Sequence, residues 1–284
     1  MTSRMAPLSQ EHIDSRNASF WSELCGSGLA RALGITEHSP HSLRKFDEAY
    51  LGFYPYLRRY VESDELAGAR VLEIGLGYGT LGQLLASRGC RYYGLDIAET
   101  PVTVMRYRLS LLGEGNGEDR VRQGSALAIP FDDGLFDHVY SIGCLHHTGN
   151  LTRAIAEVHR VLKPGGSALI MLYNKYSWRQ LVSVSPWARL RTAWSRGGAT
   201  DDRQFGAQMR ARYDGNAKGE DPPHTDYVSR TEVRRLFSRF RHVGIESQNC
   251  DPLVWRGRIL ATREQLLGSF GRLLGLDLYI RGRK

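Results

Sequence analysis

The sequence predicts an α/β fold in which a mostly parallel sheet carries helices on both of its faces. The chain has 284 residues, of which 42% are hydrophobic and 24% are charged, a balance typical of a globular protein. From residue 69 onward, short apolar runs recur at regular intervals, and stretches with helical spacing lie between them. Strands that alternate with helices form right-handed crossovers, which predicts a doubly wound, Rossmann-like sheet.

Five apolar runs are predicted to be the first strands of this sheet. They lie at 70–74, 91–95, 120–123, 138–142 and 168–173. Helical spacing at 81–88 and 151–162 predicts two of the connecting helices. The second of these helices is predicted to end at Lys163-Pro164-Gly165-Gly166, which has the residue types of a turn.

The sequence on either side of these strands is expected to form additions to the core. Residues 1–64 are predicted to be an N-terminal helical cap, in which Pro55 splits a helix. Residues 65–284 are predicted to be one domain with insertions at 175–228, after the fifth strand, and at 250–275, where a helical pattern lies near 260–274. Both insertions are expected to roof a substrate.

The end of the chain is predicted to complete the sheet. A capping box formed by Ser229 and Glu232 predicts a helix through residue 240. Strand-like segments follow at 242–248 and 276–280.

The net charge of +8 raises nucleic acid, an anionic membrane or an acidic substrate as partner classes. Arg supplies 33 of the 38 basic residues, whereas nucleic-acid surfaces use both Lys and Arg. Three later segments, 176–220, 229–242 and 250–284, each carry a net charge of +4. This distribution favours solvated helix faces, or a site for an acidic small molecule, over a nucleic-acid surface.

The sequence predicts a cytoplasmic protein. We find no signal peptide and no apolar window of about 18 residues that could span a membrane. The four cysteines are too far apart in sequence for a metal or redox motif and are expected to be free thiols. They are Cys25, Cys90, Cys144 and Cys250.

A glycine-rich loop follows the first predicted strand. Gly75, Gly77 and Gly79 occupy alternate positions, which allows a sharp turn and lets the backbone approach a ligand. A dinucleotide fingerprint would require Gly at position 80, where this chain has Thr80. Glu73, just before the loop, would repel a pyrophosphate but would suit a ligand with a positive charge.

The next two strands end in residues that suit a nucleoside. Asp96 stands where an acid accepts the ribose hydroxyls in doubly wound folds. Ser125 and Ala126 follow the third strand and precede the apolar segment 127–131. This arrangement predicts an adenine slot with apolar faces and a polar rim.

These motifs resemble the class I S-adenosylmethionine-dependent methyltransferases, in particular the small-molecule group related to the ubiquinone-biosynthesis enzymes (type 11 methyltransferase domain). The resemblance covers residues 69–174 well and 229–284 loosely. It implies a seven-stranded sheet whose last strand, 276–280, is antiparallel, and it implies S-adenosylmethionine as the cofactor.

The resemblance also implies which residues bind that cofactor. Glu73 and the three glycines would hold the methionine portion, Asp96 the ribose hydroxyls, and Ile97 the adenine face. Ser125 and Ala126 would lie at the adenine edge, where the family often has Asp in place of Ser125. The expected cofactor contacts are Glu73, Gly75, Gly77, Gly79, Asp96, Ile97, Ser125, Ala126 and Ile142.

Two histidines follow the fourth strand and are the catalytic candidates, of which the first, His146, is preferred slightly over His147. His146 and His147 are expected at the carboxyl edge of the sheet, beside the cofactor loop. An imidazole can accept a proton near neutral pH if the methyl acceptor begins protonated. The alternative is that either ring only bonds the loop and shapes the pocket.

Two regions supply candidate substrate contacts. Tyr50 and Tyr54 lie in the cap, and Tyr173, His224 and Tyr227 lie at the end of the fifth strand and in the following insertion. The alternatives are ordinary aromatic core for the cap residues and helix capping for the insertion. Asp132, Asp133 and Asp137 precede the fourth strand rather than following it, so no metal is predicted.

The sequence thus predicts methyl transfer to oxygen, nitrogen or carbon of a small, aromatic or partly apolar metabolite, in secondary metabolism. A nucleic-acid or protein methyltransferase is a second hypothesis. Two observations count against it: the Asn/Asp-Pro-Pro-aromatic motif does not follow the fourth strand, and the sequence has no Lys-rich arm. A third is a cyclase or scaffold that binds the cofactor without using its methyl group. The acceptor's identity and a homo-oligomer are left open.

Overall fold

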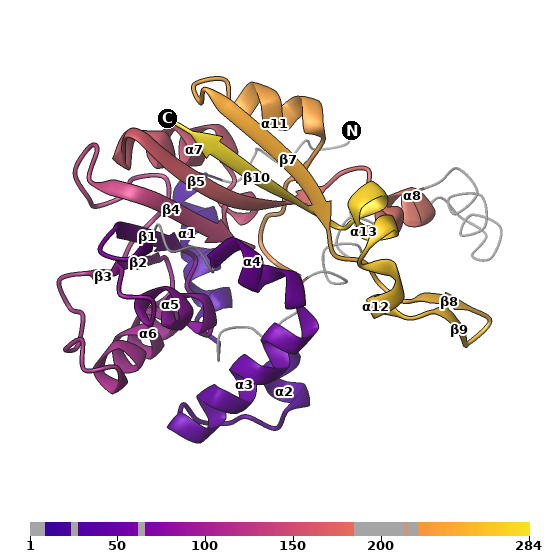
Figure 1. The fold of residues 1–284 in the computed structure, drawn as a ribbon, viewed down its shortest axis with the longest axis horizontal. Helices are drawn as coiled ribbons and strands as arrows, with labels where there is room; N and C mark the ends of the chain where they lie inside the picture. The colour runs from indigo at the N-terminus through magenta and orange to yellow at the C-terminus, as the bar shows by residue number, and fades with distance from the viewer. Residues whose placement is uncertain (1–8, 24–27, 62–65, 185–213, 215–220) are drawn as a thin grey trace, which may run out of the picture.

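A central sheet runs through the molecule and carries helices on both sides (Figure 1). The computed structural model describes residues 9–23, 28–61, 66–184, 214 and 221–284. Seven strands lie side by side in the order β3-β2-β1-β4-β5-β10-β7. The pairs among the first five strands are parallel, whereas β10 is antiparallel to both of its neighbours. The predicted doubly wound sheet with an antiparallel last strand is therefore confirmed.

The strands agree with the predicted segments, with two differences. They are β1 (Arg70–Ile74), β2 (Arg91–Asp96), β3 (Val121–Gln123), β4 (Phe136–Ile142), β5 (Leu162–Asn174), β7 (His242–Gln248) and β10 (Asp277–Arg283). A short strand, β6 (Tyr227–Val228), pairs with β5 and makes the sheet eight-stranded rather than seven-stranded. The helix end predicted at 163–166 is confirmed, because α7 ends at Val161. The second difference is that β5 begins at Leu162, with an irregular first part in which Gly165 has a φ of 80° and the β4–β5 register shifts.

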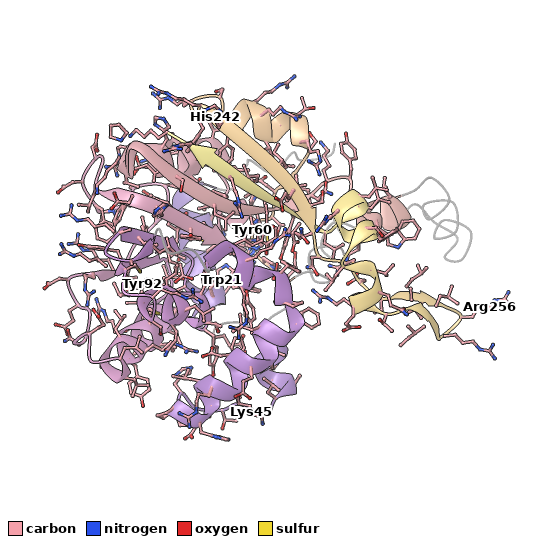
Figure 2. The ribbon with its side chains drawn as sticks, in the orientation of Figure 1. Trp21, Lys45, Tyr60, Tyr92, His242 and Arg256 are labelled. Atoms are coloured by element: carbon pink, nitrogen blue, oxygen red, sulfur yellow. The ribbon has the colours of Figure 1, made fainter. Side chains whose placement is uncertain are left out.

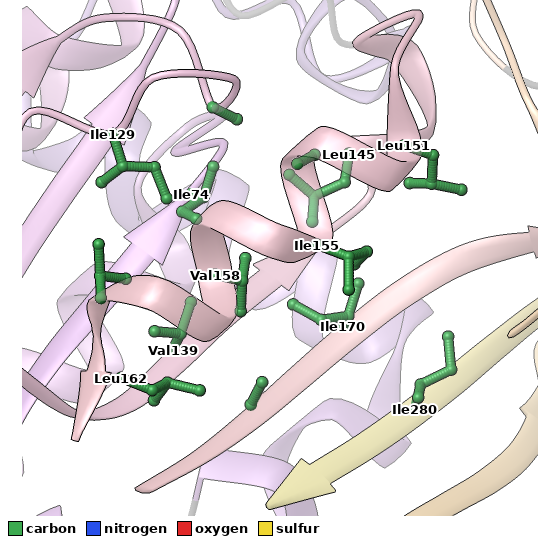
Figure 3. Packing of buried hydrophobic residues seen from close by; sticks show 14 of the residues in the cluster. Ile74, Ile129, Val139, Leu145, Leu151, Ile155, Val158, Leu162, Ile170 and Ile280 are labelled. Carbon is green, nitrogen blue, oxygen red and sulfur yellow. The ribbon is translucent and has the colours of Figure 1, made fainter. Parts of the chain in front are cut away.

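One face of the sheet packs against α7 (Leu151–Val161) and α11 (Arg230–Leu236). Alternate residues of a strand point to opposite faces, so Ile170 of β5 packs on this side while Met171 packs on the other. Figure 3 shows Ile155 and Val158 of α7 among the strand residues of this layer. The three- and four-residue spacing read from the sequence thus supplies the buried stripe of α7.

The opposite face is covered by α4 (Arg58–Val61), α5 (Thr80–Ala86) and α6 (Glu99–Leu111). Val71 of β1 and Tyr92 of β2 are fully buried against these helices. Both faces of the parallel strands are therefore apolar, as a doubly covered sheet requires.

The N-terminal segments form the helices expected of the cap. They are α1 (Gln10–Trp21), α2 (Gly28–Ala32), α3 (Pro40–Phe53) and the 3-10 helix η2 (Pro55–Leu57), which leads into α4. The predicted split at Pro55 is confirmed, because α3 ends at Phe53 and Pro55 begins η2. Proline cannot donate the hydrogen bond that would continue the helix.

The later insertions are described only in part. Helix α8 (Trp178–Val184) follows β5, and the parts of the 175–228 segment at 185–213 and 215–220 lie outside the described residues. The segment near 260–274 forms α12 (Arg263–Leu266) and α13 (Ser269–Leu274), preceded by a hairpin of β8 (Leu253–Trp255) and β9 (Arg258–Ala261). Figure 2 shows Arg256 at the tip of this hairpin, far from the sheet. In the parts of the chain that are described, no helix has the length and apolarity to cross a membrane.

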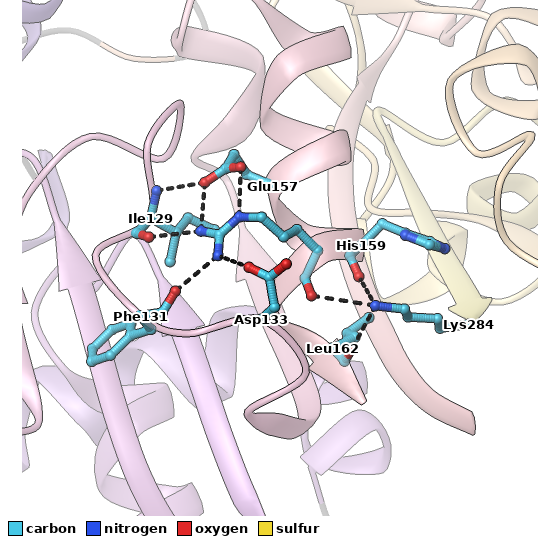
Figure 4. A network of polar contacts seen from close by, with 8 residues as sticks. Ile129, Phe131, Asp133, Glu157, His159, Leu162 and Lys284 are labelled. Carbon is cyan, nitrogen blue, oxygen red and sulfur yellow. Dashed lines mark hydrogen bonds and ion pairs between the residues drawn. The ribbon is translucent and has the colours of Figure 1, made fainter. Parts of the chain in front are cut away.

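A polar network fixes the end of α7 (Figure 4). Arg160 donates to Glu157, to Asp133 and to the Ile129 and Phe131 carbonyls, with distances of 2.6–2.9 Å. Lys284 donates to the carbonyls of His159, Arg160 and Leu162 at the last turn of the helix. The network holds the 129–133 loop in place beside the predicted adenine slot.

Candidate active site

A cavity of about 150 Å³ lies at the carboxyl ends of β1, β2 and β4. Ligands of open α/β sheets bind at this edge. Seven of the nine predicted cofactor contacts line it: Gly75, Gly77, Asp96, Ile97, Ser125, Ala126 and Ile142. The other two lie next to it, Glu73 in an adjoining cavity and Gly79 at the start of α5.

The glycine loop passes between the cavity and the packed core. Gly75 has a φ of 85°, and a Cβ there would lie 2.3 Å from the Cβ of Cys144, so no larger residue fits. Gly77, with a φ of 51°, faces open space, with no heavy atom within 4 Å of a Cβ position. The loop therefore leaves room for a ligand against the backbone at Gly77.

Asp96 is held by the backbone of the surrounding loops. One carboxylate oxygen accepts from the Leu76 amide at 2.8 Å and the other from the Ala98 amide at 2.9 Å. Burial raises the pKa of Asp96 to about 6, although these amides oppose the shift. The amides of Gly77 and Ile97 also stabilise the ionised carboxylate. Because the carboxylate lines the cavity, a ligand hydroxyl could bind it beside these amides or in place of one of them.

Glu73 is a buried acid beside the loop. It is 2% exposed and accepts a hydrogen bond from the Tyr92 hydroxyl. Burial raises its pKa to about 8. Among the residues that the structure describes, no Lys or Arg forms an ion pair with Glu73. It lines a second cavity, which shares Gly75, Gly77 and Ile142 with the first and is also lined by Tyr50.

The two histidines lie on the short 3-10 helix η4 (Leu145–His147), directly after β4. His147 lines the first cavity, whereas His146 does not. Nδ1 of His147 lies 2.8 Å from the backbone oxygen of His224, and the Asn17 side chain donates to the backbone oxygen of His147 at 2.8 Å. His146 is fully buried, and this burial holds its pKa well below the usual range.

The four predicted substrate tyrosines belong to one apolar cluster, on the face of the sheet that α4, α5 and α6 cover. The Tyr173 ring lies 4.0 Å from that of His146 and 5.9 Å from that of Tyr227, and its hydroxyl donates to Asp214 at 2.6 Å. The ring of Tyr54 lies 5.0 Å from that of Tyr50. The His224 backbone supports His147, while its Nε2 lies 3.0 Å from an oxygen of Asp226.

Several residues of the site could not be identified by sequence motifs. Asp14 and Asn17 of α1 line the first cavity. Trp21, an aromatic residue of the cap that the sequence predicts to roof a substrate, also lines it, and its ring lies 5.0 Å from that of His147. Asn17 carried one signal, because it falls between Ile13 and Phe20 on the buried side of α1. Asp14 carried none.

A buried ion pair connects the cap to the cofactor loop. Both terminal nitrogens of Arg108 donate to Asp47 of α3 at 2.8 Å, and its Nε donates to the Tyr78 carbonyl at 2.8 Å. Asp47 also accepts from Thr80 at 2.6 Å. These contacts fix α3 beside the glycine loop.

Comparisons with known proteins agree with this geometry. Residues 72–170 match the family described as a methyltransferase domain. They form a domain of the class I, S-adenosylmethionine-dependent methyltransferases. S-adenosylmethionine is the cofactor of this domain.

Two curated proteins share the domain. The chain is 36% identical over 120 residues to the ubiquinone biosynthesis O-methyltransferase of Pseudomonas aeruginosa, across 42% of this chain and 50% of that protein. It is 36% identical over 111 residues to the demethylmenaquinone methyltransferase of Clavibacter sepedonicus, across 38% of this chain and 43% of that protein. The chain thus spans about half the length of the curated methyltransferases it matches.

Solved structures support the methyltransferase fold. A putative methyltransferase of Haloferax volcanii, solved with its Trm112 activator, has a TM-score of 0.54 at 19% identity, covering 87% of this chain and 95% of that one. The YcgJ protein of Bacillus subtilis has a TM-score of 0.53 at 22% identity, covering 81% and 98%.

The residues at the methyltransferase cavity fit this cofactor. The open backbone at Gly77 accommodates a ligand, and Asp96 can accept from ribose hydroxyls. Burial favours the protonated form of Glu73, which has no ion-pair partner among the described residues, and the ammonium of the cofactor's methionine portion would favour the ionised form and compensate its charge. A pyrophosphate would instead leave two negative groups together.

Proposed function

We propose that this protein transfers a methyl group from S-adenosylmethionine to an oxygen of a small aromatic, quinol-like metabolite. The convergence of seven predicted cofactor residues in one cavity carries the proposal. Its neighbour Tyr50 and its lining residues Trp21 and His147 offer aromatic surface for an acceptor. The quinone-biosynthesis relatives support the choice of acceptor class.

The cofactor supplies an activated methyl group, because its methyl carbon is attached to a sulfonium. The protein then has to hold the acceptor atom in line with the C–S bond of the cofactor and to exclude water. Helix α1 contributes to both tasks, since Asn17 and Trp21 lie against the η4 segment that carries His147. Gln10 adds a hydrogen bond of 2.8 Å to the Thr148 carbonyl and fixes the helix there.

We assign acceptor binding to the predicted substrate residues. Tyr50 and Tyr54 come from the cap, and Tyr173, Tyr227 and His224 come from the end of β5 and the segment that precedes α11. The four tyrosines pack in one apolar cluster, which supports their lying close enough to face one acceptor. The negative charge expected on the acceptor stays a prediction, as do the cytoplasmic location and the division into a cap of 1–64 and a domain of 65–284.

Of the two histidines, we favour His147 as the residue that removes the acceptor's proton. His147 lines the cavity beside Trp21, whereas His146 does not line the cavity and packs against Tyr173. His146 is then a positioning residue, since its backbone oxygen accepts from the Asp226 amide at 2.8 Å.

The test is acceptor-dependent release of S-adenosylhomocysteine across a panel of catechols and hydroquinones. We expect release with at least one of them, and His147→Ala should lower kcat about 100-fold while cofactor affinity is retained. His159→Ala, on α7 outside the cavity, is the matched control and should keep its activity.

The other function classes give different results in this assay. Release with RNA or protein and with no small phenol would support a macromolecular methyltransferase instead. Tight cofactor binding without release from any acceptor would support a scaffold or cyclase.

A further inference from the structure

Three side chains with metal-ligating atoms converge beside the cavity, which one of them lines. They are His146, His147 and Asp214, and one ligand atom of each lies within 4.8 Å of the others. Nε2 of His147 is 3.4 Å from Oδ2 of Asp214. Asp214 is far from the two histidines in sequence, so the fold alone brings the three together.

The hydrogen bonds of His147 leave Nε2 as a lone-pair donor. A backbone carbonyl can only accept, so Nδ1, which lies 2.8 Å from the His224 oxygen, carries the proton of the neutral ring. Nε2 then faces the Asp214 carboxylate with no proton between them. Two acceptors in this arrangement repel each other unless a cation or a proton lies between them.

His146 and Asp214 add to the same pattern. His146 is fully buried, and beyond a weak interaction with the Met171 backbone neither of its ring nitrogens has a hydrogen-bond partner among the described residues. Asp214 is oriented by the Tyr173 hydroxyl, which donates to it at 2.6 Å. In metal sites, a ligating imidazole typically donates its other N–H to a carbonyl, and a ligating carboxylate typically accepts a further hydrogen bond. His147 has the first contact and Asp214 has the second.

We propose that His146, His147 and Asp214 bind a divalent transition-metal ion of the zinc class. Two imidazoles and one carboxylate are a common ligand set of catalytic zinc, which keeps a further position open, whereas Mg²⁺ and Ca²⁺ prefer oxygen ligands. The ligand atoms would approach from 4.8 Å to about 3.3 Å apart, the spacing set by bonds of about 2.0 Å in a tetrahedral site. The sequence argument against a metal considered only the acids before β4. Of these, Asp133 and Asp137 are paired with Arg160 and Lys163.

A metal ion at this site would give His147 a role as a ligand in methyl transfer, and this role rests on the proposed function. An acceptor hydroxyl in the open position would lose its proton to solvent more readily, because the ion stabilises the resulting oxyanion. That oxygen would form the new C–O bond while the C–S bond breaks, and the sulfonium would become a neutral thioether. His147 would then be a ligand rather than a base.

The binding test uses the full chain after dialysis against a chelator, titrated calorimetrically with ZnCl2. We expect one ion per chain, together with an intense visible absorption when Co²⁺ replaces Zn²⁺. His147→Ala and the isosteric Asp214→Asn should each weaken binding at least tenfold. His242→Ala, at the far edge of the sheet in Figure 2, and Asp226→Asn, beside the cluster, should bind as the wild type does.

The outcomes separate this proposal from the proposed function. If the wild type binds no zinc, or Asp214→Asn binds it unchanged, the metal site is overturned, and methyl transfer by chelator-treated protein would leave the base role of His147 standing. If zinc binds with the expected variant pattern but no acceptor is methylated, the metal site stands and the proposed function fails.

Discussion

The cofactor edge and the acceptor side of this site are built in different ways. The cofactor edge consists of loops that directly follow β1, β2, β3 and β4, so each contact lies within a few residues of a strand end. The acceptor side is assembled from α1, α3, β5 and the segment 221–228, which are far apart in sequence. Backbone geometry dominates the first region and aromatic side chains dominate the second. One fold can therefore keep its cofactor while its acceptor changes.

The largest expected effect tests whether backbone geometry controls the cofactor edge. Gly75→Ala adds a Cβ at 2.3 Å from that of Cys144 and forces a φ of 85° on alanine. We expect the free energy of unfolding to fall by about 3 kcal/mol or more, measured by denaturant titration.

Gly77→Ala is the matched control for this prediction. It has a positive φ of 51° but open space around the new methyl group. It should cost about 1 kcal/mol of stability and mainly weaken cofactor binding. Equal losses of stability in the two variants would contradict the distinction drawn between these glycines.

A smaller effect is expected at the contact between the two regions. Asp47→Ala leaves Arg108, which is 1% exposed, without its carboxylate partner. The free energy of unfolding should fall by about 2 kcal/mol, because an uncompensated buried charge remains. Glu246→Ala, which breaks the exposed pair with Arg59, should cost less than about 1 kcal/mol. Similar thermal shifts in both variants would mean that the cap is not fixed through Asp47.

A further effect is a pH dependence that originates in the cofactor edge. The pKa of Glu73 is about 8 in the folded protein against 4.5 ordinarily, so between these values the folded state holds a proton that the unfolded state has lost. Stability of the cofactor-free protein should therefore fall as pH rises from 5 to 8. Burial is the main cause of the raised pKa, and Asp96 adds to it, whereas Tyr92 and Arg108 oppose it.

Glu73→Gln should reduce this slope in thermal melts at several pH values. Asp96 and Asp277, whose pKa values are about 6 and 7, keep part of it. An unchanged slope in Glu73→Gln would show that this carboxyl is already ionised in the folded protein.

The same contrast explains what the sequence could predict. The strand segments, the glycine loop, Asp96 and the Ser125–Ala126 slot follow from local patterns of strand, turn and helix. The roles of Asn17, Arg108 and Asp214 depend on contacts between residues 30 to 130 positions apart. A single sequence carries no periodicity or spacing that encodes such contacts, so the acceptor side stayed largely hidden.

The bulge in β5 has a related cause. Lys163-Pro164-Gly165-Gly166 has the composition of a turn, yet the backbones of Gly165 and Gly166 form hydrogen bonds with Lys284, the residue after β10, and extend the strand pairing there. Composition reports what a segment can adopt, and the neighbouring strands decide among those conformations.

Calorimetric titration with S-adenosylhomocysteine tests the central claim most directly. The wild type should bind one ligand per chain, and Asp96→Asn should raise the Kd about tenfold, because a neutral amide is a weaker acceptor for hydroxyls than a carboxylate. Asp133→Asn, which changes an exposed acid outside the cavity, should leave the Kd unchanged. A wild type that binds no ligand, or an Asp96→Asn variant that binds it as tightly as the wild type, would contradict the placement of the cofactor at this edge.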